Sequence, residues 1–216
     1  MVAVPMKPQY GPTLGTLLSP RWRAASPLAR RAVIAAGVAL LALLVIAGLT
    51  LENAKYSHGG RLPFGFSYRS LYRVASEPGS FVKIQRHRSD GELEDSLAVS
   101  PLELPPYSGS LSGELPLYAA GYITGLSHRI PQFVLRGEGK TKVDTMPAYA
   151  VAYTTVLEGR TMWGRDILLV PERTGAREGV DIAMLTSPTA SSQVDSPSEV
   201  GLAGVLSRPL RTFSLG

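Results

Sequence analysis

The 216-residue chain contains no cysteine and only one asparagine, and its first 31 residues contain neither aspartate nor glutamate. Without cysteine, the chain can form no disulfide and carries no thiol for lipid attachment. Without acidic residues, the first 31 residues have a formal charge of +5, equal to that of the whole chain. The rest contains 17 basic and 17 acidic groups. Because that part has no net attraction for phosphate, we expect no nucleic-acid partner.

Charge is also absent from residues 32–51, where no side chain is more polar than that of Thr50. A helix of twenty residues is about 30 Å long, which matches the hydrocarbon core of a bilayer. The segment therefore predicts a transmembrane helix at 32–51, flanked by Arg30 and Arg31 on one side and Glu52 on the other. Basic residues beside a first hydrophobic segment stay in the cytoplasm. We therefore expect a single-pass plasma-membrane protein with a cytoplasmic N-terminus and an extracytoplasmic C-terminal part.

A cleaved signal peptide is the alternative to a permanent anchor. Signal peptides have apolar cores of about 7 to 15 residues that end at small residues. Here the apolar run is longer, and Glu52 lies two residues before Ala54, the first alanine beyond it. This favours a retained signal anchor. The chain then divides into a disordered basic cytoplasmic tail (1–31), the transmembrane helix (32–51), a juxtamembrane spacer (52–62) and an extracytoplasmic α+β domain (63–216).

Short apolar runs dominate the region from 63 to 216. Those at 148–157, 167–170 and 180–185 predict an antiparallel meander. Further strands are predicted at 64–68, 71–75, 80–87, 93–104, 133–136 and 210–215, with Gly137 and Gly139 in a turn. Apolar residues at steps of three and four predict a helix at 114–129, which Pro131 ends. The capping box Ser196-Pro197-Ser198-Glu199 predicts a second helix, which Pro209 ends. The expected fold is an antiparallel sheet with two packed helices, preceded by one transmembrane helix.

Several of these segments resemble the PsbP-like α/β sandwich domain over residues 64–215. The resemblance lies in Met146-Pro147-Ala148-Tyr149, in Val170-Pro171, in the strand at 180–185 and in the segment from Ser207 to Phe213. The resemblance implies an accessory or partner-binding domain, because such domains are mostly not enzymes. It implies no catalytic residue.

No segment of the sequence predicts a catalytic, cofactor or metal site. Gly139-Lys140-Thr141 lacks the earlier glycine and the following helix of a phosphate-binding loop. His58, His87 and His128 are too scattered for zinc, and the acidic residues 90–95 lack the spacing of a calcium loop. We therefore expect no cofactor and no enzymatic activity, with an envelope hydrolase that has an unrecognised active site as the alternative.

Aromatic residues offer two interpretations, core packing or a binding surface. The helical spacing of Tyr118 and Tyr122 favours core packing. Met162, Trp163 and Arg165 lie near an expected turn, and they are the candidate partner surface. The predicted function is a membrane-anchored extracytoplasmic binding or accessory domain, with the lipid bilayer and another envelope or membrane protein as partners. Arginine outnumbers lysine 17 to 5, which suggests a GC-rich bacterial genome.

Overall fold

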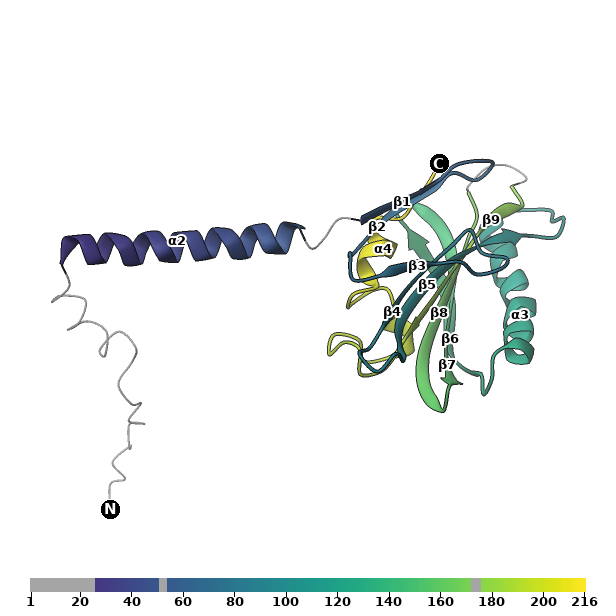
Figure 1. The fold of residues 1–216 in the computed structure, drawn as a ribbon. Coiled ribbons are helices and arrows are strands. Elements are labelled where there is room, and N and C mark those ends of the chain that lie inside the picture. The colour runs from purple at the N-terminus through teal and green to yellow at the C-terminus, as the bar shows by residue number, and fades with distance from the viewer. Residues whose placement is uncertain (1–25, 51–53, 172–175) are drawn as a thin grey trace, which may run out of the picture. The chain divides into compact units, whose positions relative to one another are not determined.

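The computed structural model of the chain describes residues 26–50, 54–171 and 176–216 (Figure 1). The described residues divide into two units, one up to Thr50 and the other from Ala54 on. The first unit contains helix α2 (Pro27–Thr50) and the second contains the α+β domain. Most of the predicted tail, and Glu52, lie outside the described residues.

Helix α2 begins five residues before the predicted transmembrane segment. Pro27 occupies its first turn, and the Ser26 Oγ accepts a hydrogen bond from the Ala29 N–H at 3.2 Å. A hydroxyl acceptor followed by proline is a common start for a helix. The predicted disordered tail is thus wrong for residues 27–31, which are helical, and Arg30 and Arg31 lie inside α2. The described side chains from Arg31 to Leu44 are exposed.

The domain is built on a seven-stranded sheet in which every neighbouring pair is antiparallel. Its strand order is β3 (Arg73–Ala75), β4 (Val82–His87), β5 (Leu93–Glu103), β9 (Glu178–Thr186), β8 (Arg160–Leu169), β7 (Met146–Leu157) and β6 (Val134–Val143). The meander predicted from the sequence is β7, β8 and β9. Because side chains alternate along each strand, the sheet presents two faces that both need a cover.

A smaller sheet covers one face. It pairs β1 (Ala54–His58), β2 (Phe64–Tyr68) and β10 (Ser214–Leu215), and it encloses a core with Ile167, Ile182 and Phe213. Helix α3 (Leu111–Arg129) covers the other face and encloses a second core with Val151 and Leu168. Figure 1 shows α3 along one side of the large sheet and β1 with β2 on the domain's opposite part. The predicted α+β class with an antiparallel sheet is confirmed.

The structure corrects two local predictions near strands. The expected spacer 52–62 contains β1, which is in register with β2 from Ala54 opposite Tyr68 to His58 opposite Phe64. The expected turn at Gly137 and Gly139 is part of β6, and Gly139 pairs with Ala150. The chain instead turns at 144–145, where Asp144 has a φ of 54°. Pairing with β7 outweighs the weak strand preference of the two glycines.

The second predicted helix is also different. The capping-box residues form only a 3-10 helix, η1 (Pro197–Glu199), and the Ser196 side chain makes no capping hydrogen bond. Glu199 Oε2 accepts a hydrogen bond from the Asp195 N–H at 2.8 Å. After a turn with Gly201 at a φ of 80°, the short helix α4 (Ser207–Arg211) includes Pro209 within it. Pro209 is therefore inside a first turn, where it loses no hydrogen bond, rather than at a helix end.

Candidate binding site

Strand β8 carries the three residues predicted to form a partner surface. It starts at Arg160, so Met162, Trp163 and Arg165 lie in an interior strand rather than beside a turn. Met162 is 1% exposed and Arg165 is 5% exposed, whereas Trp163 is half-buried and packs against the first core. The expectation of an exposed surface is therefore wrong for Met162 and Arg165. Alternation along the strand separates Met162 from the other two residues.

Arg165 is a buried cation with little compensation. Its Nη1 donates a hydrogen bond of 3.1 Å to the Val200 carbonyl, just beyond η1. Among the described residues, no carboxylate lies within salt-bridge distance of its guanidinium. Burial lowers the pKa of Arg165, yet arginine keeps its charge at neutral pH. A buried charge without a counterion costs several kcal/mol, as an order of magnitude, so the position calls for an explanation.

A groove of about 240 Å³ opens above Arg165. Its walls are small, because Gly137, Gly139, Ala150 and Ala152 leave the surface of β6 and β7 bare on this face. A side-chain carbon added at Gly139 would meet nothing within 4 Å. Ser198 of η1 lines the groove beside this surface. The groove is thus lined by small residues and carries the positive charge of Arg165.

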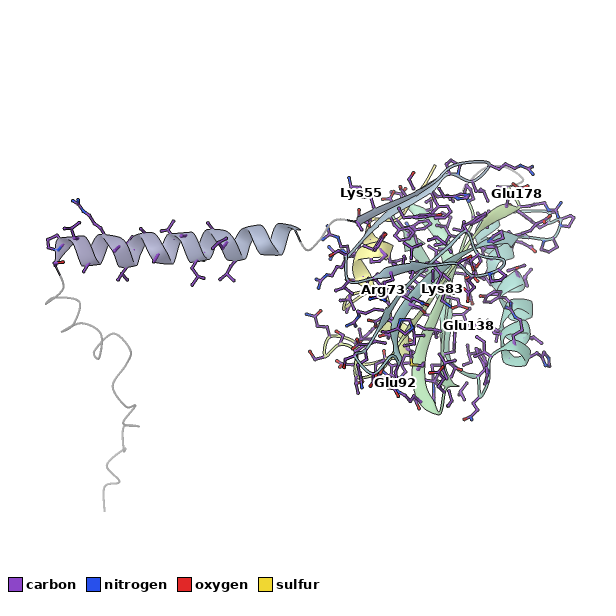
Figure 2. All side chains as sticks on the ribbon, in the orientation of Figure 1. Lys55, Arg73, Lys83, Glu92, Glu138 and Glu178 are labelled. Carbon is purple, nitrogen blue, oxygen red and sulfur yellow. The ribbon has the colours of Figure 1, made fainter. Side chains whose placement is uncertain are left out.

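Glu138 does not neutralise this groove with its side chain. It pairs with Val151, which faces α3, so its side chain points to the α3 face of the sheet. There it accepts a hydrogen bond from the Tyr149 hydroxyl. Figure 2 labels Glu138 on the part of the sheet next to α3. The charge of Arg165 is therefore available to an anionic group that enters from the other face.

Strand β6 forms the edge of the sheet beside the groove. It is the last strand in the sheet order, and in the described part of the chain no strand pairs with its outer side. Its outer N–H and C=O groups can therefore pair with an added strand of a partner. Arg136, Lys140 and Lys142 along this edge are exposed. An acidic extended segment fits both the edge and the groove.

The α3 face of the sheet contains a second polar cluster. The Tyr122 hydroxyl of α3 lies 2.7 Å from Asp166 Oδ2 and 2.7 Å from Asp181 Oδ2. The Tyr153 hydroxyl donates a hydrogen bond of 3.1 Å to Asp166 Oδ1. A hydroxyl has only one hydrogen, so one of the two contacts of Tyr122 needs a hydrogen from a protonated carboxyl. The two aspartates therefore hold one proton between them.

Electrostatics supports this shared proton. Burial raises the pKa of Asp166 well above its usual range, and the nearby charge of Asp181 raises it further. Burial raises the pKa of Asp181 to about 6. Arg129, at the end of α3, lowers both pKa values. Asp166 is 1% exposed, so this cluster fastens α3 to the sheet and offers no room for a substrate.

Sequence reasoning missed the cluster of Asp166 and Asp181. The available signal was one aspartate just before the apolar run at 167–170 and another inside the run at 180–185. Only the pairing of β8 with β9 brings Asp181 to the same face of the sheet as Asp166. In the described residues, no three histidine or acidic side chains gather in a way that could hold a metal ion.

Comparison with known proteins places this domain by its fold. No protein-family model and no curated protein matches the sequence. Among the solved structures, LpqN of Mycobacterium tuberculosis, which is involved in cell envelope biogenesis, shares 10% of residues at a TM-score of 0.51. That match covers 75% of this chain and 90% of LpqN. A cyanobacterial PsbP from Synechocystis matches with 13% identity and a TM-score of 0.48, over 77% of this chain and 94% of its own. The likeness to LpqN is one of fold alone.

Proposed function

We propose that this protein is a single-pass membrane protein whose extracytoplasmic domain binds another envelope protein through the groove above Arg165. The observation that carries the proposal is a buried arginine, 5% exposed, that faces an open groove and has no carboxylate partner among the described residues. A partner that inserts a carboxylate would supply the missing charge and form a charge-assisted, bidentate hydrogen bond. The structural likeness to an envelope protein agrees with this type of role.

Helix α2 supports the anchoring part of the proposal. Its 24 residues correspond to about 36 Å, and the segment Pro27–Leu44 has a mean hydropathy of 1.8. A helix that is apolar all round and has exposed side chains needs either lipid or a protein cover. The charge of the N-terminal residues then favours an N-terminus in the cytoplasm and a domain outside it, at the plasma membrane.

Edge strand β6 supports a protein partner rather than a small molecule. A groove bounded by an open strand edge suits an extended segment, whose backbone pairs with β6 while an acidic side chain reaches Arg165. The same geometry disfavours the hydrolase alternative. The adjacent carboxyls of Asp166 and Asp181 lie under α3 and contact the Tyr122 hydroxyl.

Site-specific photocrosslinking in native membranes tests this function. A photoreactive residue at Ser198 in the full-length chain should capture one envelope protein, whereas the same residue at Leu117 should not. Leu117 is the matched control because it is 72% exposed on α3, which covers the other face of the sheet. Arg165→Met in the Ser198 chain should abolish the capture. Equal capture from both positions, or capture that survives Arg165→Met, would contradict the proposal.

Arg165→Met also distinguishes a binding role of Arg165 from a structural role. Arg165→Met loses one hydrogen bond to a carbonyl, worth about 1.5 to 3 kcal/mol, but removes a desolvation penalty of similar size. The free energy of unfolding should therefore change by less than about 1 kcal/mol. A loss of capture together with unchanged stability is the expected pair of results. The topology is tested separately, since an exported reporter such as alkaline phosphatase should be active when fused after Gly216.

A further inference from the structure

A second open pocket, of about 470 Å³, lies where α4 meets the end of β2. Three arginines line it: Arg69 directly follows β2, while Arg208 and Arg211 belong to α4. The hydroxyl residues Ser207 and Thr212 also line it, and none of the described residues in its wall is acidic. The pocket is separate from the groove above Arg165, with which it shares no lining residue.

The arginines are held on a rigid frame. Thr212 joins the two elements, because its Oγ1 accepts a hydrogen bond of 2.9 Å from the Ser67 N–H and donates one of 2.9 Å to the Arg208 carbonyl. Within α4, Pro209 and Leu210 are buried against the core. Figure 1 shows α4 beside β2. The pocket is thus formed in advance of binding, which reduces the entropy that a ligand would have to overcome.

Like charges gather in this pocket at a cost. Arg208 and Arg211 are three residues apart on one helix, a spacing at which side chains are neighbours and equal charges repel. Arg69 and Arg211 are both exposed, and neither forms a salt bridge with a described residue. Lys55, labelled in Figure 2, adds a further cation on β1 opposite Ser67. An anion in the pocket would relieve this repulsion.

We propose that Arg69, Arg208 and Arg211 form a binding site for a phosphate group, with the headgroup of an anionic phospholipid as its source. Guanidinium groups match phosphate oxygens in geometry and hydrogen-bond them in pairs. A carboxylate carries a single negative charge, so three cations in one open pocket favour a phosphate group over a carboxylate as the ligand.

The lipid source, unlike the phosphate chemistry, rests on the proposed anchoring. Ala54 begins β1 and pairs with Tyr68, the residue before Arg69. Only residues 51–53 separate Ala54 from the last residue of α2. If α2 crosses the bilayer, the chain enters the domain close to the lipid headgroups and next to Arg69. Anionic headgroups attract each nearby arginine.

The experiment uses the full-length chain in a neutral detergent at constant ionic strength, with two probes. Inorganic phosphate is titrated by calorimetry, and retention of phosphatidylglycerol against phosphatidylcholine is measured by native mass spectrometry. The double variant Arg69→Gln/Arg211→Gln should weaken phosphate binding about tenfold or more, since it removes two charge-assisted contacts. Arg88→Gln, at an exposed arginine directly after β4, is the matched control and should leave binding within about twofold.

Arginine-dependent binding of either probe supports the site, and the two probes distinguish its source. Preference for phosphatidylglycerol that the double variant removes identifies the lipid headgroup, whereas arginine-dependent binding of phosphate alone identifies a soluble phosphate compound. Binding of neither probe, or an equal loss in Arg88→Gln, would overturn the proposal. The double variant should lose the same binding in an Arg165→Met background, so failure of the groove above Arg165 would not imitate failure of this site.

Discussion

Replacing Asp181 by asparagine should stabilise the domain, and more so at high pH than at low pH. Burial raises the pKa of Asp181 in the folded protein from 3.8 to about 6. The folded state therefore binds a proton that the unfolded state has already released between about pH 4 and pH 6, and stability falls as pH rises through that interval. Above about pH 6, Asp181 lowers the free energy of unfolding by its full amount. Below the unfolded pKa both states are protonated and the penalty disappears.

The size of the effect follows from the shift. The pKa of Asp181 rises by about two units, and each unit is worth about 1.4 kcal/mol. Asp181 therefore lowers the free energy of unfolding by roughly 3 kcal/mol at pH 8 and by little at pH 4. Asparagine does not ionise, and its amide oxygen can still accept a hydrogen bond from Tyr122. Asp181→Asn also removes the neighbouring charge that raises the pKa of Asp166. We therefore expect the variant to gain about 2 to 3 kcal/mol more, relative to the unmodified chain, at pH 8 than at pH 4.

Urea denaturation of residues 51–216 measures this difference, with the fluorescence of Trp163 as the signal because it is the only tryptophan of that fragment. We expect the fragment to fold alone, since it forms one compact unit. Asp195→Asn is the matched control. Asp195 is exposed, so its substitution should change the free energy of unfolding equally at pH 4 and pH 8. The reasoning fails if Asp181→Asn has the same effect at pH 4 and pH 8, or if it destabilises the domain at pH 8.

Three further predictions concern other parts of the chain. Asp95 is fully buried and accepts hydrogen bonds from Arg86 and Thr186, so Asp95→Asn should lower the free energy of unfolding by about 3 to 5 kcal/mol at pH 7; a smaller loss than 1 kcal/mol in urea denaturation would contradict this. Ser196→Ala should change stability by less than about 0.5 kcal/mol, because the Ser196 side chain makes no cap; a shift of the midpoint by more would show a helix cap after all. Leu41→Arg places a charge inside α2, at a cost of about 2.5 to 3.5 kcal/mol on insertion scales, and should reduce carbonate-resistant membrane integration; unchanged integration would count against a single span.

The sequence by itself determined the local elements of this protein. The uncharged run at 32–51, the alternation at 148–157 and the helical spacing at 114–129 each reflect a periodicity that depends only on neighbouring residues. They sufficed for the α+β class and for the meander β7-β8-β9. Two predictions that rested on weak local signals were wrong. Gly137 and Gly139 indicated a turn, and the capping box at Ser196 indicated a long helix, but strand pairing and packing against the sheet decided otherwise.

Only the tertiary structure decided the sites. Asp166 and Asp181 meet at Tyr122 because β9 pairs with β8 and α3 crosses above them, and no short-range pattern contains those contacts. Arg165 became a buried charge because the segment that follows η1, more than thirty residues later, packs beside it, and the Val200 carbonyl there accepts its hydrogen bond. Arg69 and Arg211 come together only when the C-terminal segment returns to β2. Burial and electrostatics depend on such distant neighbours, and this is why the sequence indicated residue types but not their roles.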